Sequence, residues 1–393
     1  MMPRRGLLGS LMLVVLAGCL PIELDVAQDG RVLIPRQEGF FTVDPTSGQV
    51  VKVYAPAQGE PMFAKFLSED KQILALSKLP GGGMGVSTTM TRVDLTDGKT
   101  QQLATVGNMT YLTVSPDGKY AAYTRLADQP KGDAQEQFPE LHSMEVATGI
   151  TKALTPASSV AVIHRWFPDS KSILVFAITE KVTPVHEEGQ EGQGPGEYYR
   201  GLLAKVDLAD GKQTPLAAVL GGKDVFFDLS PDGKAVLFTA LTAGKADATD
   251  LKPAQNEQLH ELKLDSGAIR VVGPTVSFAV YSPNGKHVLL GGEAEAQVGG
   301  GMGMGGGEGL TLRVADADGG NARTIASDAM KQAGDMGDSA KIYPSWLGND
   351  KVIYLTSRTV YGTTGKNLEL VSIGIDGRNR TSLQATIDAA ATK

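Results

Sequence analysis

One stretch of the sequence decides the fold: Ser115-Pro116-Asp117-Gly118-Lys119, followed by the apolar run Tyr120-Ala121-Ala122-Tyr123. It returns as Ser230-Pro231-Asp232-Gly233-Lys234 before an apolar run, and again as Ser282-Pro283-Asn284-Gly285-Lys286. Weaker copies surround four further basic residues, so the chain is built from repeats. The seven basic anchors, whose numbers differ by 40 to 65 from one to the next, are Arg31, Lys71, Lys119, Lys171, Lys234, Lys286 and Lys351.

Each anchor lies between two apolar segments. Five residues before it stand Val26, Phe66, Val114, Trp166, Leu229, Tyr281 and Trp346. Two consecutive apolar residues follow it, as in Ile73-Leu74 and Val236-Leu237, which predicts a strand that is buried on both faces. The Pro-Asp-Gly between the segments predicts a tight turn that joins two strands into a hairpin, because Pro fixes φ, Asp bonds its own backbone and Gly accepts a positive φ.

A second hairpin recurs later in each repeat, for example at Asp94-Leu95-Thr96-Asp97-Gly98 and Asp207-Leu208-Ala209-Asp210-Gly211. Alternating apolar residues precede it and a short outer strand follows it, so each repeat is expected to contain four strands. Four-stranded repeats of this length are typical of propeller blades. We therefore predict an all-β chain that forms a β-propeller of seven four-stranded blades, with six or eight blades as alternatives.

The Ser-Pro-Asp-Gly-Lys pattern with its apolar strand resembles the WD40-like PD40 repeat of TolB-type β-propellers. The resemblance covers nearly the whole chain after residue 18, and it is strongest around Lys119, Lys234 and Lys286. Two departures limit what it implies about function. TolB carries an additional N-terminal domain, whereas here a strand-like segment, Ile22 to Val26, comes almost at once. Prolyl-oligopeptidase relatives add a hydrolase domain, and this sequence has no Gly-x-Ser-x-Gly motif.

The first residues are expected to be a leader. Arg4 and Arg5 precede an apolar core from Leu7 to Ala17, which has the length of a secretory signal. Leu16-Ala17-Gly18-Cys19 then resembles the lipobox of bacterial lipoproteins. The resemblance implies cleavage before Cys19, the only cysteine, and acylation of that residue. We thus expect a signal peptide over residues 1–18 and a single propeller domain over residues 19–393.

The same resemblance predicts the location of the protein. A lipid at Cys19 implies a bacterial cell envelope, and two or three acyl chains hold a protein firmly at a membrane. Leu20 follows the cysteine where lipoproteins retained in the inner membrane usually carry Asp, so the periplasmic face of the outer membrane is favoured if the organism is Gram-negative. The net charge of −7, without basic runs, argues against nucleic acid as a partner.

Long connections between the second and third strands of six blades are one candidate for a binding site. The topology gathers them at one end of the ring, opposite both sets of tight hairpins, and long loops on a rigid scaffold often bind partners. Two of them are rich in Gly and Met, and their candidate binding residues are Met84, Met302 and Met304. The alternative explanation for the length of these connections is that a protein surface tolerates inserted residues without any binding role. We expect no metal site and no cofactor there, because the composition is that of a flexible loop.

A ring of polar residues near the central tunnel is the second candidate. Six residues before each anchor stand Asp25, Lys65, Thr113, Arg165, Asp228, Val280 and Ser345. Most repeats have an aromatic residue two positions earlier: Phe63, Tyr111, Phe226, Phe278 and Tyr343. Such a ring could bind a small ligand or a peptide end. The favoured interpretation is simpler: Asp25 with Lys65, and Arg165 with Asp228, belong to neighbouring blades and pair with each other.

Histidines do not converge in this arrangement. His142 and His260 occupy equivalent positions in third strands of non-neighbouring blades, so each is expected to pack locally. His164 is expected to point into packing on the same side as Trp166.

The favoured function is therefore a lipid-anchored scaffold that binds an envelope protein or peptide, without enzymatic activity. The alternatives are a propeller hydrolase or lyase, and a lipoprotein that senses a ligand or metal at the tunnel mouth. Charges paired across blades favour the scaffold, whereas an unpaired carboxylate in a deep pocket would favour an enzyme.

Overall fold

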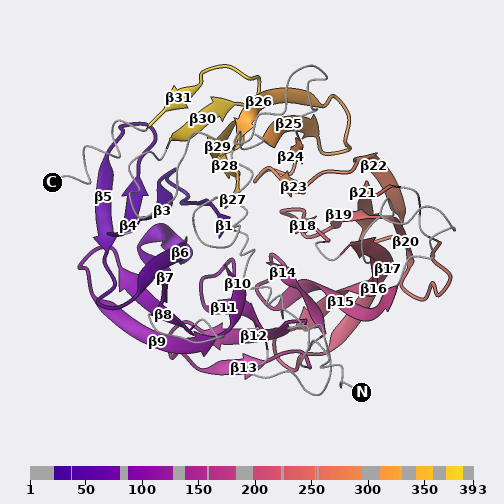
Figure 1. The fold of residues 1–393 in the computed structure, drawn as a ribbon, viewed down its shortest axis with the longest axis horizontal. Coiled ribbons are helices and arrows are strands. Elements are labelled where there is room, and N and C mark those ends of the chain that lie inside the picture. The colour runs from indigo at the N-terminus through magenta and orange to yellow at the C-terminus, as the bar shows by residue number, and fades with distance from the viewer. Residues whose placement is uncertain are drawn as a thin grey trace, which may run out of the picture.

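The computed structural model describes residues 22–36, 38–79, 87–126, 138–156, 159–182, 198–222, 225–252, 254, 256–293, 310–329, 342–356 and 369–383. Within these ranges the chain forms seven radial sheets around a central axis, as Figure 1 shows. The prediction of seven four-stranded blades is confirmed. One 3-10 turn, η1 (Ser68–Asp70), is the described helical element. None of the described helical segments has the length and apolar character needed to span a membrane.

The first three blades follow one another in chain order. Blade 1 comprises β2 (Asp25–Val26), β3 (Val32–Arg36), β4 (Gly39–Val43) and β5 (Val50–Tyr54). Blade 2 comprises β6 (Glu60–Phe66), β7 (Gln72–Lys78), β8 (Ser87–Asp94) and β9 (Thr100–Gly107). Blade 3 comprises β10 (Met109–Val114), β11 (Tyr120–Arg125), β12 (Glu140–Glu145) and β13 (Thr151–Ala153).

The remaining blades continue the ring. Blade 4 comprises β14 (Val160–Trp166), β15 (Ser172–Val182), β16 (Tyr198–Asp207), β17 (Gln213–Gly222) and the added β20 (Thr242–Lys245). Blade 5 comprises β18 (Phe227–Leu229), β19 (Ala235–Ala240), β21 (Gln258–Lys263) and β22 (Ile269–Pro274). Blade 6 comprises β23 (Phe278–Tyr281), β24 (His287–Glu293), β25 (Leu310–Asp316) and β26 (Arg323–Ala329). Blade 7 comprises β28 (Ser345–Leu347), β29 (Lys351–Leu355), β30 (Leu370–Gly374) and β31 (Thr381–Ser382).

The tight hairpins have the predicted chemistry. In blade 3 the Ser115 hydroxyl donates to Asp117 at 2.7 Å, and the Asp117 carboxylate accepts the backbone N–H of Lys119 at 3.1 Å. Gly118 has φ +70°, a conformation that costs glycine little. Ser230 with Asp232 and Ser282 with Asn284 repeat the side-chain hydrogen bond.

The hydrophobic core lies between the blades. Ile73, Leu74, Val236 and Leu237 are almost completely buried, which confirms that the second strands are covered on both faces. One cluster joins blades 1 and 2, and others join blades 3 and 4, blades 4 and 5, and blades 5 and 6. The stability of the ring therefore depends on the contacts that each blade makes with its neighbours.

The segment that closes the ring differs from the prediction, which placed a single strand over Ile22 to Val26. The structure has two short strands there, because β1 (Ile22–Glu23) pairs in parallel with β27 (Ile342–Tyr343) and only β2 joins blade 1. Both strands of this pair lie near the centre of the ring in Figure 1. A hydrophobic cluster that contains Leu24 and Ile353 also joins blades 7 and 1. The two ends of the ring are thus held by packing and by this central pair.

Blade 4 departs from the four-stranded pattern. Its strands β15, β16 and β17 have 11, 10 and 10 residues. Outside them, β20 from the connection between β19 and β21 of blade 5 pairs with β17, with Leu220 opposite Thr242. A satellite cluster of Tyr198, Ala218, Leu220, Leu241 and Leu251 covers the junction. Most residues of this connection of blade 5 are described by the structure, unlike those of the other long connections. It therefore extends the sheet of blade 4 by one strand.

Candidate functional site: a cross-blade network at the inner strands

The inner strands place the predicted polar ring at the contacts between blades. Lys65 Nζ lies 3.4 Å from Asp25 Oδ1, and Arg165 Nε lies 3.0 Å from Asp228 Oδ1. Both predicted pairs are therefore confirmed. The four side chains keep between 11% and 21% of their surface exposed, so water screens these charges weakly.

Each aspartate also fixes the backbone of the next blade. Asp25 Oδ2 accepts the N–H of Phe66 at 2.5 Å, and Asp228 Oδ2 accepts the N–H of Tyr281 at 2.9 Å. Phe66 and Tyr281 both stand five residues before a basic anchor. The sequence analysis did not predict these hydrogen bonds to the backbone. The pattern that could have indicated them is the aspartate six residues before the anchor in both blade 1 and blade 5. One carboxylate thus binds a cation and an amide and joins two inner strands.

Arg165 is the centre of the larger network, which spans blades 3 to 6. Its guanidinium donates to the hydroxyl of Tyr111 and to the carbonyl of His164. It also lies over the rings of Tyr111 and Phe226, at 5.9 and 5.7 Å from their centroids. Phe226 in turn contacts Phe278 edge to face, with centroids 6.3 Å apart. The structure therefore brings together two members of the polar ring, Arg165 and Asp228, and three of the aromatic positions that precede ring members.

The uncharged ring members add no charge to this network, although Val280 packs against the cluster that contains Phe226 and Phe278. Thr113 is buried in blade 3, whereas Val280 and Ser345 are half-buried in blades 6 and 7. The carbonyl of Val280 instead accepts the indole N–H of Trp346 at 3.1 Å, which joins blade 6 to blade 7. Of the early aromatics, Phe63 belongs to the core around blades 1 to 3.

The histidines pack locally, as predicted. His142 stacks on Tyr123 at 5.1 Å and His260 stacks on Phe238 at 5.3 Å, each within its own blade. Burial lowers the pKa of His260, although its hydrogen bond to the carbonyl of Ala240 opposes the shift. His164 is fully buried and its Nε2 lies 3.0 Å from the carbonyl oxygen of Ala122 in blade 3.

Buried carboxylates distinguish a structural network from an acid–base site. Among the described residues the buried ones are Asp228 and Glu261. Glu261 lies 2.6 Å from Arg270 and 2.8 Å from Lys263, so it is paired on the outer side of blade 5. Both carboxylates are therefore paired with cations. The described ranges also hold no group of three or more His, Cys, Asp or Glu side chains placed to share a metal ion.

A third charge cluster joins blades 6 and 7. Asp328 accepts hydrogen bonds from Arg380 at 3.2 and 2.6 Å and from the Tyr354 hydroxyl at 3.1 Å. Burial alone would raise the pKa of Asp328, but the hydrogen bonds and positive charge of Arg380 outweigh it and hold the pKa below its usual value of 3.8. Burial, with the nearby Asp328 charge, raises the pKa of Tyr354.

This lowered pKa predicts a loss of stability in acid. The ionised carboxylate contributes its full stabilisation above pH 3.8, the unfolded value, and that contribution disappears as the pH falls through the lower folded value. Urea unfolding between pH 6 and about pH 2.5 should show a decline below pH 4 that is shallower in Asp328→Asn. Parallel curves for the two proteins would contradict this role.

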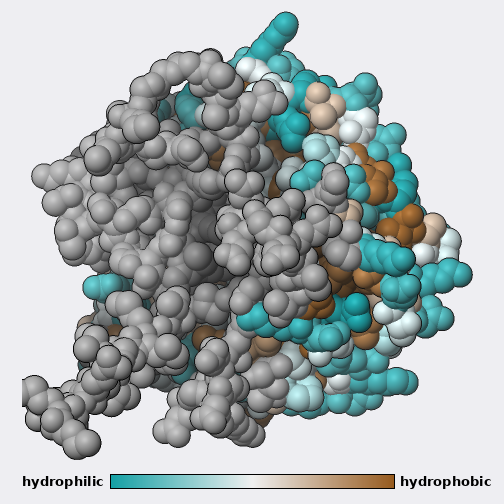
Figure 2. All heavy atoms as spheres, turned by 45° about the vertical axis from the view of Figure 1, so that its right-hand side comes forward, coloured by the Kyte–Doolittle hydropathy of each residue, from teal (hydrophilic) through white to brown (hydrophobic). Residues whose placement is uncertain are grey.

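The remaining predicted site residues lie outside the described ranges. Cys19, Met84, Met302 and Met304 are among them, so their placement stays a prediction. Figure 2 shows that hydrophilic residues dominate the described surface on one side of the ring, with smaller hydrophobic patches between them.

Comparisons with known proteins agree on the fold. No family model matches the chain, and no curated protein matches it. Among solved structures it is similar to the oligogalacturonate lyase of Vibrio parahaemolyticus, with 11% identity, 86% of each chain covered and a TM-score of 0.56. It is also similar to a prolyl endopeptidase structure at 13% identity and a TM-score of 0.57, with 91% of this chain and 48% of that chain covered. TolB from Acinetobacter baumannii matches at 15% identity and a TM-score of 0.46, with 89% and 77% covered.

The seven radial sheets of the structure define the class of the protein as a β-propeller with seven blades. TolB structures are among the solved structures that are similar to this chain. The chain spans about half the length of the prolyl endopeptidase, and identities this low carry no activity from one protein to the other.

Proposed function

We propose that this protein is a lipid-anchored binding module of the bacterial cell envelope, which binds a protein or peptide partner at the end of the ring that carries the long connections. The pairing of the inner charges is the observation that supports a binding module over an enzyme. Asp228 holds a guanidinium and a backbone amide at once, so its two oxygens already serve the structure. An acid–base catalyst needs a carboxylate that can exchange a proton with a substrate.

The position of β1 supports the membrane-side orientation. The first strand of each blade runs towards the Ser-Pro-Asp-Gly hairpin, so Ile22, which precedes β2, enters from the opposite end of the ring. Two residues, Leu20 and Pro21, lie between Cys19 and Ile22, and the three extended Cα–Cα steps from Cys19 to Ile22 span roughly 10 Å. A lipid on Cys19 would hold the long-connection end next to the bilayer, at the periplasmic face of the outer membrane if the organism is Gram-negative.

Site-specific photo-crosslinking in the native envelope tests the binding role. Photoreactive residues would replace Met84 and Met302 in two long connections, with Thr46 in a tight hairpin of blade 1 as the control. Thr46 is exposed, and its backbone rather than its side chain bonds Asp44. We expect a discrete protein adduct from the two loop positions and none from Thr46. Adducts to lipid alone, or equal labelling at all three positions, would remove the support for a partner at this end.

A further inference from the structure

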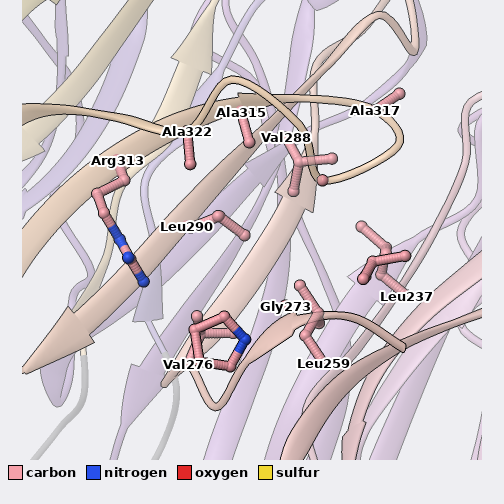
Figure 3. A pocket seen from close by; sticks show the side chains of 13 residues that line it. Leu237, Leu259, Gly273, Val276, Val288, Leu290, Arg313, Ala315, Ala317 and Ala322 are labelled. Atoms are coloured by element: carbon pink, nitrogen blue, oxygen red, sulfur yellow. The ribbon is translucent and has the colours of Figure 1, made fainter.

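A small apolar cleft lies between blades 5 and 6, and its lining residue Leu237 is the cross-strand neighbour of Asp228 and of Glu261. Leu237 and Leu259 line it from blade 5, and Val288, Leu290 and Ala315 line it from blade 6. Figure 3 shows these side chains around the cavity, with Arg313 at one side of the view and Leu237 at the other. The cavity volume is about 50 Å³, which has room for a few methyl groups but is well below the roughly 150 Å³ of a cavity that accepts benzene.

Two alanines create this space where blades 2 to 5 carry larger residues. Ala315 lies opposite Val288, the second residue after the anchor of blade 6. The residues in the same position of blades 2 to 5 are Val93, Met144, Val206 and Leu262. The equal register shows that the ring geometry does not require a small side chain there.

Ala317 repeats the substitution two residues later. Its backbone N–H donates to the carbonyl of Lys286, the anchor of its blade. The residues that make the same bond to their own anchors in blades 2 to 5 are Leu95, Val146, Leu208 and Leu264. Blade 6 therefore lacks two large apolar side chains that blades 2 to 5 carry at the corresponding positions.

Arg313 gives the cleft a positive charge. It is half-buried opposite Leu290, and a Cβ placed on Gly292 would lie 3.8 Å from its Nη2. It has no carboxylate or hydrogen-bond partner among the residues that the structure describes, in contrast to Arg165 and Arg380 in their networks. The equivalent positions of blades 3 and 5 hold His142 and His260, which are covered by aromatic rings. An unpaired guanidinium beside an apolar cavity is complementary to a carboxylate that accompanies an aliphatic group.

We propose that the cleft between blades 5 and 6 binds the C-terminal residue of a peptide that ends in a branched aliphatic side chain. The side chain enters the space left by Ala315 and Ala317, and the terminal carboxylate binds Arg313. An aromatic terminal residue is excluded by the volume. This site is independent of the membrane-side partner proposed above, so failure of one leaves the other standing.

Fluorescence anisotropy with the whole mature protein tests the site. The probe is a fluorescein-labelled Gly-Ser-Gly-Val-Leu peptide with a free C-terminal carboxylate, and the comparison is the same peptide as the amide. We expect the amide to bind at least about tenfold more weakly, because a charge-assisted pair is lost. Equal affinities, or no binding of the free acid at about 1 mM, would overturn the proposal.

Three variants separate the two halves of the site. Arg313→Gln should reduce binding of the free acid to the level of the amide and leave the amide unchanged. Ala317→Leu restores the side chain found in blades 2, 4 and 5, so it should fold normally and abolish binding of both peptides. Lys286→Gln removes one exposed charge on the same blade and should change neither. Retained binding in Ala317→Leu, with an unfolding midpoint at least equal to that of the parent, would show that the cleft is not the site.

Discussion

Replacing Asp228 by Ala is expected to lower the free energy of unfolding by about 3–5 kcal/mol, because it leaves the guanidinium of Arg165 without its carboxylate in a poorly hydrated place. The same change frees the backbone N–H of Tyr281, which is buried. Urea unfolding of the purified protein measures the loss. Asp228→Asn should cost less, since an amide oxygen still accepts that N–H.

Two further proteins make this result specific. Asp265→Ala removes an exposed carboxylate from the same blade and should change stability by no more than about 0.5 kcal/mol. The double replacement of Arg165 by Met and Asp228 by Leu should recover most of the loss, since apolar residues often substitute for a buried ion pair without net cost. A single Asp228→Ala variant as stable as the parent would show that the pair does not hold the blades together.

Gly291→Ala is expected to lower the free energy of unfolding by overpacking the core of blade 6. Gly291 lies opposite Phe278, and a Cβ there would lie 1.9 Å from Cε1 of that ring. Phe278 is fully buried, so the ring cannot move aside without disturbing Phe226. Overpacking of this kind costs about 1–3 kcal/mol or more. Thermal or urea unfolding gives the value.

The control is a glycine in the neighbouring blade. Gly273 also lies in a strand, and a Cβ on it meets nothing within 4 Å, so Gly273→Ala should be close to neutral. Combining Gly291→Ala with Phe278→Leu should cost less than the sum of the two single changes, because they act on the same contact. Strict additivity would contradict the proposed collision.

Much of the fold could be predicted because the signals were local and repeated. The Pro-Asp-Gly turns, the doubly buried second strands and the aspartates of the inner strands each recur at a fixed distance from a basic anchor. Pairing of Asp25 with Lys65 and of Arg165 with Asp228 then followed from the neighbourhood of the blades. Because the same structural unit recurs along the chain, each repeat indicates a blade independently, and the predicted number of seven blades was therefore correct.

The features that escaped prediction depend on contacts between distant segments. β20 has the sequence Thr-Ala-Gly-Lys, which carries no strand periodicity, and it becomes a strand because the edge of β17 offers hydrogen bonds. Parallel pairing of β1 with β27 joins residues about 320 apart, and two-residue strands have no pattern of their own. The cleft at Ala315 and Ala317 did have a signal, since a comparison of the third strands would have shown two small residues in blade 6.

If the long-connection end of the ring lies next to the membrane, energy transfer from the protein to a bilayer should be strongest at that end. A donor dye would be placed on Ser87→Cys, at the start of β8, or on Asp97→Cys, in the hairpin after it, with an acceptor at the surface of lipid vesicles. β8 has eight residues, so the two positions differ in height by roughly 26 Å. The lipidated protein should transfer energy more efficiently from position 87 than from position 97, and Cys19→Ser should not bind the vesicles. Equal or reversed transfer, or membrane binding without Cys19, would rule out this orientation of the ring and its lipid anchor.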